Sequence, residues 1–137
     1  MPVIGCSKAD KGTAAPLAGE TARTRILLVD DDDIVRESVG SMLDFLGFEP
    51  VLAATGEEAL ALLGEGLRPS LAILDMDMPG LGGAGTLPRL RDLCPDLPVL
   101  IVTGRVTELV HHLIRQFPGV SLLPKPFNLA GLRDRLP

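Results

Sequence analysis

Ile26-Leu27-Leu28-Val29-Asp30-Asp31-Asp32-Asp33 is the stretch of sequence that decides the fold, because an unbroken apolar run ends directly in four acids. A short continuous apolar run is typical of a strand with both faces covered, as in a parallel sheet. Ligands of such sheets bind beyond the carboxyl ends of the strands, where these acids stand. The stretch therefore predicts a buried strand that delivers acidic side chains to one edge of a parallel sheet.

Apolar segments and helix-like segments alternate along the rest of the chain, and this order is typical of β-α units around a parallel sheet. We expect strands at residues 26–29, 51–54, 71–74, 99–102 and 120–123. We expect helices at 35–46, 57–63, from near Thr86 onward with Pro88 in the first turn, at 107–117, and at 129–136 after an Asn128 cap. Thr55 and Glu58 have the spacing of a capping box. The predicted fold is α/β, a doubly wound sheet of five parallel strands with five helices.

Length and composition indicate a single folded domain. The chain has 137 residues, of which 46% are hydrophobic and 23% charged, the balance of a globular core. Residues 1–24 are rich in Gly, Ala, Thr and Pro without apolar periodicity, so we expect a flexible N-terminal tail before a domain at 25–137. Residues 124–137 provide only one short helix after the last strand, with nothing to bind DNA or catalyse a second reaction.

The charge distribution bears on possible partners. The formal net charge is −5, and four of the basic residues lie in the first 25 residues, which leaves the body more acidic than the total. Nucleic-acid binding needs clustered Lys and Arg, so we expect no nucleic-acid partner. No apolar run approaches the roughly 20 residues of a membrane span, and none near the start is long enough for a signal peptide. The expected location is the cytoplasm, away from the membrane.

Residues with useful chemistry stand at the ends of four predicted strands. They are Asp30 and Asp31 after the first strand, Asp75 after the third, Thr103 after the fourth and Lys125 after the fifth. Oxygen ligands of this kind suit a hard cation, and Mg²⁺ binds one or two carboxylates together with water and phosphate oxygens. A lysine and a hydroxyl add a positive charge and a donor. Together these groups are suited to phosphoryl transfer onto a carboxylate.

Four motifs in the chain resemble those of response-regulator receiver domains, the CheY-like superfamily of two-component signalling. The motifs are Ile26-Leu27-Leu28-Val29-Asp30-Asp31-Asp32, Leu74-Asp75-Met76-Asp77-Met78-Pro79-Gly80, Val102-Thr103-Gly104 and Lys125-Pro126-Phe127. Their order and separation match the family over residues 25–137. The resemblance implies a flavodoxin-like fold and a phosphorylation-dependent switch that is not itself an enzyme. We expect its output to be contact with another protein, or the acceptance and onward transfer of phosphoryl groups.

The resemblance also implies roles for single residues. Asp75 is the expected phosphoacceptor, and Asp30 and Asp31 are the expected acidic pair for Mg²⁺. Met76 would lend its backbone carbonyl to the metal, Thr103 would bind a phosphoryl oxygen, and Lys125 would counter its charge. The family further implies a cis peptide before Pro126 and a sensor histidine kinase or histidine phosphotransfer protein as phosphodonor.

The chain departs from the family pattern at two places. Leu122 stands where receivers usually carry an aromatic residue, and the chain has no Tyr or Trp, so aromatic coupling to an output surface is in doubt. Gly82-Gly83 replaces the more usual Asp-Gly, which predicts an unusually mobile loop. Asp77 and Arg105 lie two residues beyond the acceptor and the threonine, and we hypothesise that they pair across the site and limit the access of water.

Two other functions compete with the phosphorylated switch. One is a phosphohydrolase of the haloacid dehalogenase type, because Leu74-Asp75-Met76-Asp77-Met78 resembles the start of its nucleophile motif. That motif normally lies on the first strand, and here an acidic pair precedes it. The other is a binding module that keeps the fold without being phosphorylated, which Leu122 favours and the complete set of site residues opposes.

Overall fold

The computed structural model describes residues 23–78 and 80–137. The tail predicted for residues 1–24 lies outside the described residues except for its last two, and so does Pro79. Residue Thr24 already contacts the sheet region, because its carbonyl accepts a hydrogen bond from the amide of Glu49 at 2.8 Å.

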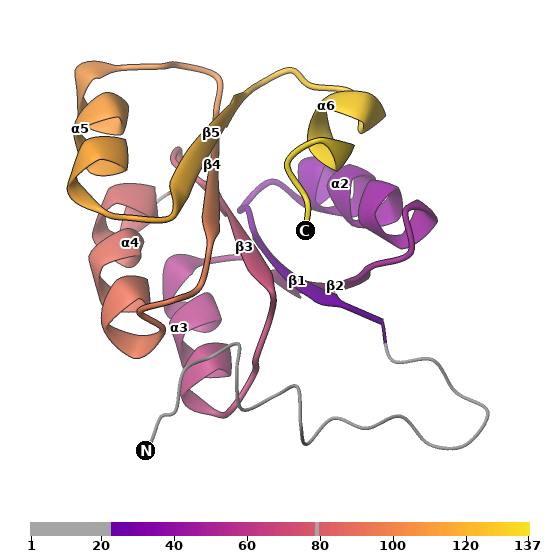
Figure 1. Cartoon of the computed structure of the whole chain (residues 1–137), viewed down its shortest axis with the longest axis horizontal. Helices are drawn as coiled ribbons and strands as arrows, with labels where there is room; N and C mark the ends of the chain where they lie inside the picture. The colour runs from indigo at the N-terminus through magenta and orange to yellow at the C-terminus, as the bar shows by residue number, and fades with distance from the viewer. Residues whose placement is uncertain (1–22, 79) are drawn as a thin grey trace.

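Five parallel strands form one sheet, as the sequence predicts (Figure 1). They are β1 (Arg25–Val29), β2 (Glu49–Ala53), β3 (Leu71–Asp75), β4 (Val99–Thr103) and β5 (Val120–Pro124). Their order across the sheet is β2-β1-β3-β4-β5. The chain thus extends the sheet to one side of β1 with β2 and to the other side with β3, so the order reverses between β1 and β3. Crevices at such a reversal are the usual ligand sites of doubly wound sheets.

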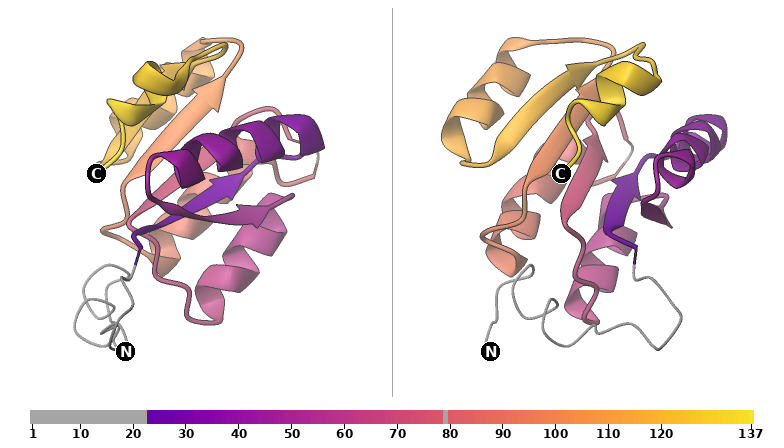
Figure 2. Two further views of the ribbon diagram at one scale, coloured as in Figure 1. Left: turned by 90° about the vertical axis from the view of Figure 1, so that its right-hand side faces the viewer. Right: turned by 45° about the vertical axis from the view of Figure 1, so that its right-hand side comes forward.

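Helices cover both faces of the sheet. They are α2 (Asp33–Phe45), α3 (Gly56–Gly64), α4 (Gly82–Leu93), α5 (Glu108–Gln116) and α6 (Leu129–Arg133). Helices α2 and α6 lie on one face, and α3, α4 and α5 lie on the other (Figures 1 and 2). Among the described residues, no helix is both long enough and apolar enough to span a membrane.

Because successive side chains of each strand point to opposite faces of the sheet, the apolar core is divided into two layers. On β1, Leu27 and Val29 pack with the buried residues of α3, α4 and α5, whereas Ile26 and Leu28 pack with those of α2 and α6. Successive side chains of a strand point to opposite faces, so an unbroken apolar run is what a strand covered on both sides requires. This packing explains why the strand sequences are continuous apolar runs. It also holds the carboxyl ends of the strands at one edge of the sheet.

The predicted helix starts follow capping chemistry. Asp32 caps α2, with its side chain accepting from the amides of Ile34 and Val35, and Asn128 caps α6 by accepting from the amide of Gly131. Thr55 caps α3 by accepting from the amide of Glu58. The reciprocal half of the predicted capping box is shifted by one residue, because the Glu58 carboxylate accepts from the amide of Ala54 at 2.8 Å.

Two helix boundaries were predicted wrongly. Helix α4 begins at Gly82 rather than near Thr86, so the expected mobile glycine loop is largely helix and Pro88 lies inside it. The glycines serve close packing: a Cβ at Gly83 would lie 2.7 Å from the backbone oxygen of Asp75. Helix α6 ends at Arg133, three residues before the expected end at Leu136.

Candidate functional site

The ends of β1, β3, β4 and β5 meet at one rim of the sheet. Backbone hydrogen bonds continue just past the strands there: Asp30 donates to the carbonyl of Ala53, Met76 donates to that of Val102, and Lys125 donates to that of Thr103. The register pairs Asp75 with Val102 and Thr103 with Pro124. The parallel arrangement of the strands therefore brings together, at one edge of the sheet, residues that are up to 95 positions apart in the sequence.

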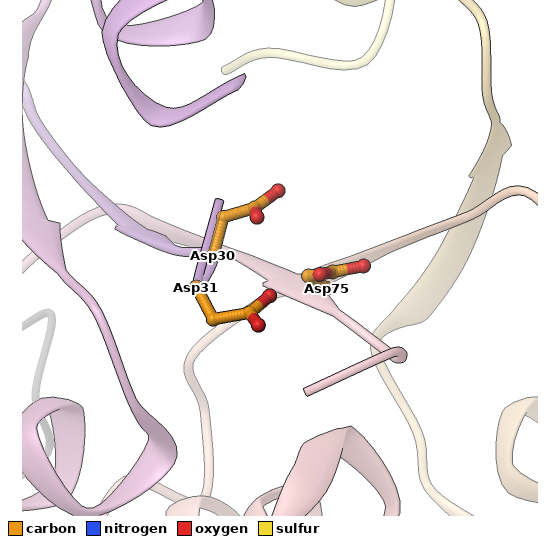
Figure 3. A group of neighbouring side chains, drawn as sticks. All are labelled: Asp30, Asp31 and Asp75. Atoms are coloured by element: carbon orange, nitrogen blue, oxygen red, sulfur yellow. The ribbon is translucent and has the colours of Figure 1, made fainter. Parts of the chain in front are cut away.

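Three aspartates form an acidic cluster at this rim. One carboxylate oxygen from each of Asp30, Asp31 and Asp75 lies within 4.8 Å of the others. Figure 3 shows the three side chains gathered at the ends of β1 and β3. Asp30 and Asp75 are buried, at 1% and 2% exposed, and Asp31 is exposed. The cluster is thus closed toward the sheet and open toward solvent through Asp31.

Lys125 extends from the end of β5 into this cluster. Its Nζ donates to Asp75 Oδ1 at 3.2 Å and to Asp30 Oδ2 at 3.4 Å. The peptide bond between Lys125 and Pro126 is cis, as the family resemblance implies. One ammonium group therefore contacts two buried carboxylates, which leaves the cluster with an excess of negative charge.

Burial and the neighbouring charge together shift the pKa of Asp75. Burial, with a further contribution from the nearby Asp30 charge, raises the pKa of Asp75 from 3.8 to about 6, although Lys125 opposes the shift. Burial by itself lowers the pKa of Lys125, but attraction to Asp75 and Asp30 outweighs it and raises the pKa above its usual value. The lysine thus stays charged, and Asp75 is a carboxylate that a further positive charge would stabilise.

Thr103 lies at the same rim, but its hydroxyl is engaged elsewhere. The hydroxyl donates to the carbonyl of Arg105 at 2.9 Å and accepts from the amide of Arg105 at 3.1 Å. Within the described part of the chain it makes no hydrogen bond to the aspartates. Thr103 could bind a group on Asp75 only if these hydrogen bonds to Arg105 were broken.

Asp77 and Arg105 both line a cavity of about 210 Å³ beside the rim. Met76 and Thr103 also line it, together with the first turns of α4 and α5. The two charged side chains form no ion pair with each other in residues 23–78 and 80–137. Their placement agrees with a flanking position, while the pairing proposed from sequence stays a prediction.

Arg36 is a site neighbour that sequence reasoning did not identify. Its Nη1 donates to the carbonyl of Asp30 at 2.7 Å, and its Nη2 contacts Asp33 Oδ1 at 2.5 Å. The separation of Asp33 and Arg36 by three residues on a helix was a usable signal for the second contact. Nothing in the sequence pointed to the first, which depends on the path of the chain after β1.

Comparison with known proteins places this geometry in a family. The sequence model of the response regulator receiver domain family matches residues 26–137 of this chain. The chain belongs to the response-regulator receiver family. The response regulator MprA of Mycolicibacterium vanbaalenii is 43% identical over 114 residues, which cover 82% of this chain and 48% of that protein. The chain thus spans about half the length of this curated relative.

Solved receiver structures share the fold. A CheY-like receiver domain protein from Methanospirillum hungatei matches with a TM-score of 0.78 and 30% identity, over 83% of this chain and 90% of that one. The chemotaxis protein CheY4 of Vibrio cholerae matches with a TM-score of 0.74 and 29% identity, over 82% of this chain and 95% of that one. The fold predicted from the sequence, flavodoxin-like and of receiver type, is confirmed.

The acidic cluster of this receiver fits a divalent cation. Receiver domains bind Mg²⁺ at an acidic pocket, and the donors here are carboxylate oxygens, the ligand type that Mg²⁺ prefers. The Asp31 carboxylate accepts no hydrogen bond from residues that the structure describes, so its oxygens are open for coordination. Two buried like charges with only one lysine between them provide the electrostatic reason for a cation.

Leu122 stands at the position where the family resemblance leads us to expect an aromatic residue. The side chain is partly buried and packs against the core layer beneath α3, α4 and α5. A leucine has neither a ring that can turn inward nor a hydroxyl that can become exposed, so the expectation drawn from sequence is unchanged.

Proposed function

We propose that this receiver domain is a phosphorylation-dependent signalling switch in which Asp75 accepts a phosphoryl group in the presence of Mg²⁺. The domain extends over residues 25–137. The observation that carries the proposal is the setting of the Asp75 carboxylate, 3.2 Å from Lys125 and beside Asp30 and Asp31. A carboxylate in this position has a counter-charge on one side and open cation ligands on the other.

Each rim residue has a role in this proposal. Asp30, Asp31, Asp75 and the backbone carbonyl of Met76 would hold Mg²⁺, which supplies charge neutralisation for the phosphoryl oxygens. Lys125 already lies within hydrogen-bond distance of Asp75 and would pair with the oxygens added there. Thr103 would exchange its bond to the Arg105 carbonyl for one to the phosphoryl group.

The proposed partners are those that membership of the receiver family implies. The phosphoryl group would come from a sensor histidine kinase or a histidine phosphotransfer protein, and the output would be contact with another protein. The chain spans about half the length of the MprA relative. The activity of the whole protein, including any output, is therefore part of the proposal. We place it in the cytoplasm, where such phosphodonors supply receivers.

Incubation with acetyl phosphate and Mg²⁺, followed by intact-mass measurement, tests the proposal. The protein should gain the mass of one phosphoryl group, and the gain should vanish in Asp75→Asn and without Mg²⁺. Asp92→Asn is the matched control, because it removes an exposed carboxylate of α4 away from the rim. Unmodified mass under all conditions would favour a binding module that is not phosphorylated.

The phosphohydrolase alternative requires turnover rather than a single modification. It predicts continuous hydrolysis of a generic phosphate ester such as p-nitrophenyl phosphate, lost in Asp77→Asn because Asp77 would be its acid/base. The acidic pair that follows β1, which the phosphohydrolase motif does not require before its nucleophile, and the family match to regulatory receivers favour the switch.

A further inference from the structure

The Arg36 guanidinium bridges the two ends of the loop between β1 and α2. It donates from Nη1 to the carbonyl of Asp30 and from Nη2 to the carboxylate of Asp33. Its side chain is 18% exposed, although it belongs to a helix whose first turn faces solvent. A planar fork with two separate acceptors holds its position far better than a single ammonium would.

The loop that Arg36 bridges carries the open ligand of the acidic cluster. Asp30 Oδ1 accepts from the amide of Asp32 at 2.9 Å, and Asp32 in turn caps α2. Asp31 lies between these two fixed residues and has no side-chain hydrogen bond of its own in the described part of the structure. Its carboxylate, visible in Figure 3, is therefore positioned by its backbone alone.

The peptide that joins Asp30 to Asp31 is the part of this backbone that Arg36 touches. The carbonyl oxygen of Asp30 and the amide nitrogen of Asp31 lie in one rigid peptide plane. A donor on that carbonyl therefore fixes the orientation of the plane from which the Asp31 side chain departs. The distance of 2.7 Å is short for a neutral acceptor and typical of a charge-assisted bond.

We propose that Arg36 is a positioning residue for the divalent-cation site, because its bridge between the Asp30 carbonyl and Asp33 holds the Asp31 carboxylate toward Asp75. The proposal rests on the proposed function, since it concerns the same cation site. Partners that orient metal ligands without touching the metal typically change metal affinity by about 10–100-fold when removed. The expected loss for Arg36 is about tenfold, at the lower end, because Asp30 and Asp75 keep their own fixed positions.

Charge works in the opposite direction and can be separated from positioning. A guanidinium near a cation site repels the cation. If Arg36 acted only through its charge, the protein would therefore bind Mg²⁺ more tightly after Arg36→Gln, and its affinity would be unchanged after Arg36→Lys. Positioning by the fork predicts weaker binding in both variants, because lysine keeps the charge but cannot donate along two fixed directions. The pair of substitutions thus distinguishes the two effects.

Calorimetric titration of the metal-free protein with MgCl₂ tests the proposal. The Kd should rise about tenfold in Arg36→Gln and severalfold in Arg36→Lys relative to the unsubstituted protein. The control is Arg115→Gln, which removes an equal charge from an exposed position on α5 and should leave the Kd within about twofold. With acetyl phosphate, the Mg²⁺ concentration for half-maximal rate should rise by the same factor, while the rate at saturating Mg²⁺ stays close to the original.

Three results would overturn the proposal. One is an unchanged Kd in Arg36→Gln accompanied by lower stability in EDTA, which would make Arg36 a structural residue only. Another is tighter binding in Arg36→Gln, and the third is an unchanged Kd in Arg36→Lys. Absence of Mg²⁺ binding in the unsubstituted protein is a different failure, because it would remove the proposed function and the Arg36 proposal together.

Discussion

At the residue scale, the central feature is a buried carboxylate placed between a like charge and an opposite one. Asp75 is 2% exposed, lies beside Asp30 and receives a hydrogen bond from Lys125. Burial and the Asp30 charge raise its pKa to about 6. In the metal-free protein, ionisation of the Asp75 carboxyl group therefore costs more free energy in the folded state than in the unfolded chain.

The pH dependence of stability in EDTA should report this cost. Well below pH 3.8 Asp75 is protonated in both states. As the pH rises from there through 6, the folded protein loses stability relative to the unfolded chain, by about 2–3 kcal/mol at most. The free energy of unfolding of Asp75→Asn minus that of the unsubstituted protein should thus increase from pH 4 to pH 8, measured by urea denaturation. A difference that is the same at both pH values would contradict the assignment.

Arg105 provides a second prediction at this scale. If Asp77 and Arg105 restrict water at the rim, Arg105→Ala should shorten the lifetime of the phosphoryl group. Exposed ion pairs contribute about 0–1 kcal/mol, so the expected factor is at most about five. Loss of phosphate after removal of the donor is the measurement, and Arg115→Ala is the control for a change of charge alone. Equal lifetimes would end this idea.

At the scale of elements, the approach of α4 to the end of β3 shapes the site. A Cβ at Gly83 would lie 2.7 Å from the backbone oxygen of Asp75 and 2.8 Å from the Cα of Met76. Both neighbours belong to the chain segment that carries the candidate phosphoacceptor. The helix can come this close only because Gly83 has no side chain.

Substitution of Gly83 by alanine should therefore destabilise the protein by about 1–3 kcal/mol, since the backbone of the site must shift. Gly64→Ala is the matched control: Gly64 is the last residue of α3, and nothing lies within 4 Å of an added Cβ. Alanine there should be neutral or stabilise the protein by up to about 1 kcal/mol. Thermal or urea unfolding of both variants makes the comparison, and equal effects would show that the close approach is not required.

The same helix shows where sequence reasoning fails. Local propensity assigned the glycines of residues 80–85 to a loop, because glycine is a poor helix former. Tertiary contact decided otherwise, with Gly83 against β3 and with Thr86 touching the start of α3 at Gly56. Such contacts join elements distant in sequence, and a single sequence does not reveal them.

The strand ends, by contrast, could be predicted well. A parallel sheet places all carboxyl ends at one edge, so Asp30, Asp75 and Lys125 had to approach each other once the strands were identified. The sequence did not reveal that Thr103 uses its hydroxyl within its own turn, or that Arg36 reaches back to the Asp30 carbonyl. Both depend on loop conformation, which apolar periodicity does not encode.

At the scale of the whole molecule, the acidic cluster joins segments that only the folded chain brings together. Asp30 and Asp31 follow β1, whereas Asp75 ends β3, and the two strands are neighbours at the reversal of strand order. A cation held by this cluster binds the folded state and not the unfolded chain. Ligand binding of this kind stabilises the fold by mass action.

Mg²⁺ should therefore raise the melting temperature of the protein. At a concentration about a hundredfold above Kd, the gain is about 2.7 kcal/mol, or roughly 10 °C for a domain of this size. Asp31→Asn should lose most of the shift while folding normally, because Asp31 is exposed. Glu37→Gln, an exposed charge removed from the same region of α2, should keep it. A shift of equal size in both variants would mean that the stabilisation does not come from the cluster.

The chemical identity of the modified residue is the most direct test of Asp75 as the phosphoacceptor. Acyl phosphates are reduced by borohydride, so phosphorylation followed by reduction and peptide mass spectrometry converts the phosphorylated aspartate into homoserine at its own position. We expect homoserine at residue 75 alone, formed only when Mg²⁺ was present. Homoserine at Asp30, Asp31 or Asp77, or equal formation at residue 75 without a divalent cation, would contradict this assignment.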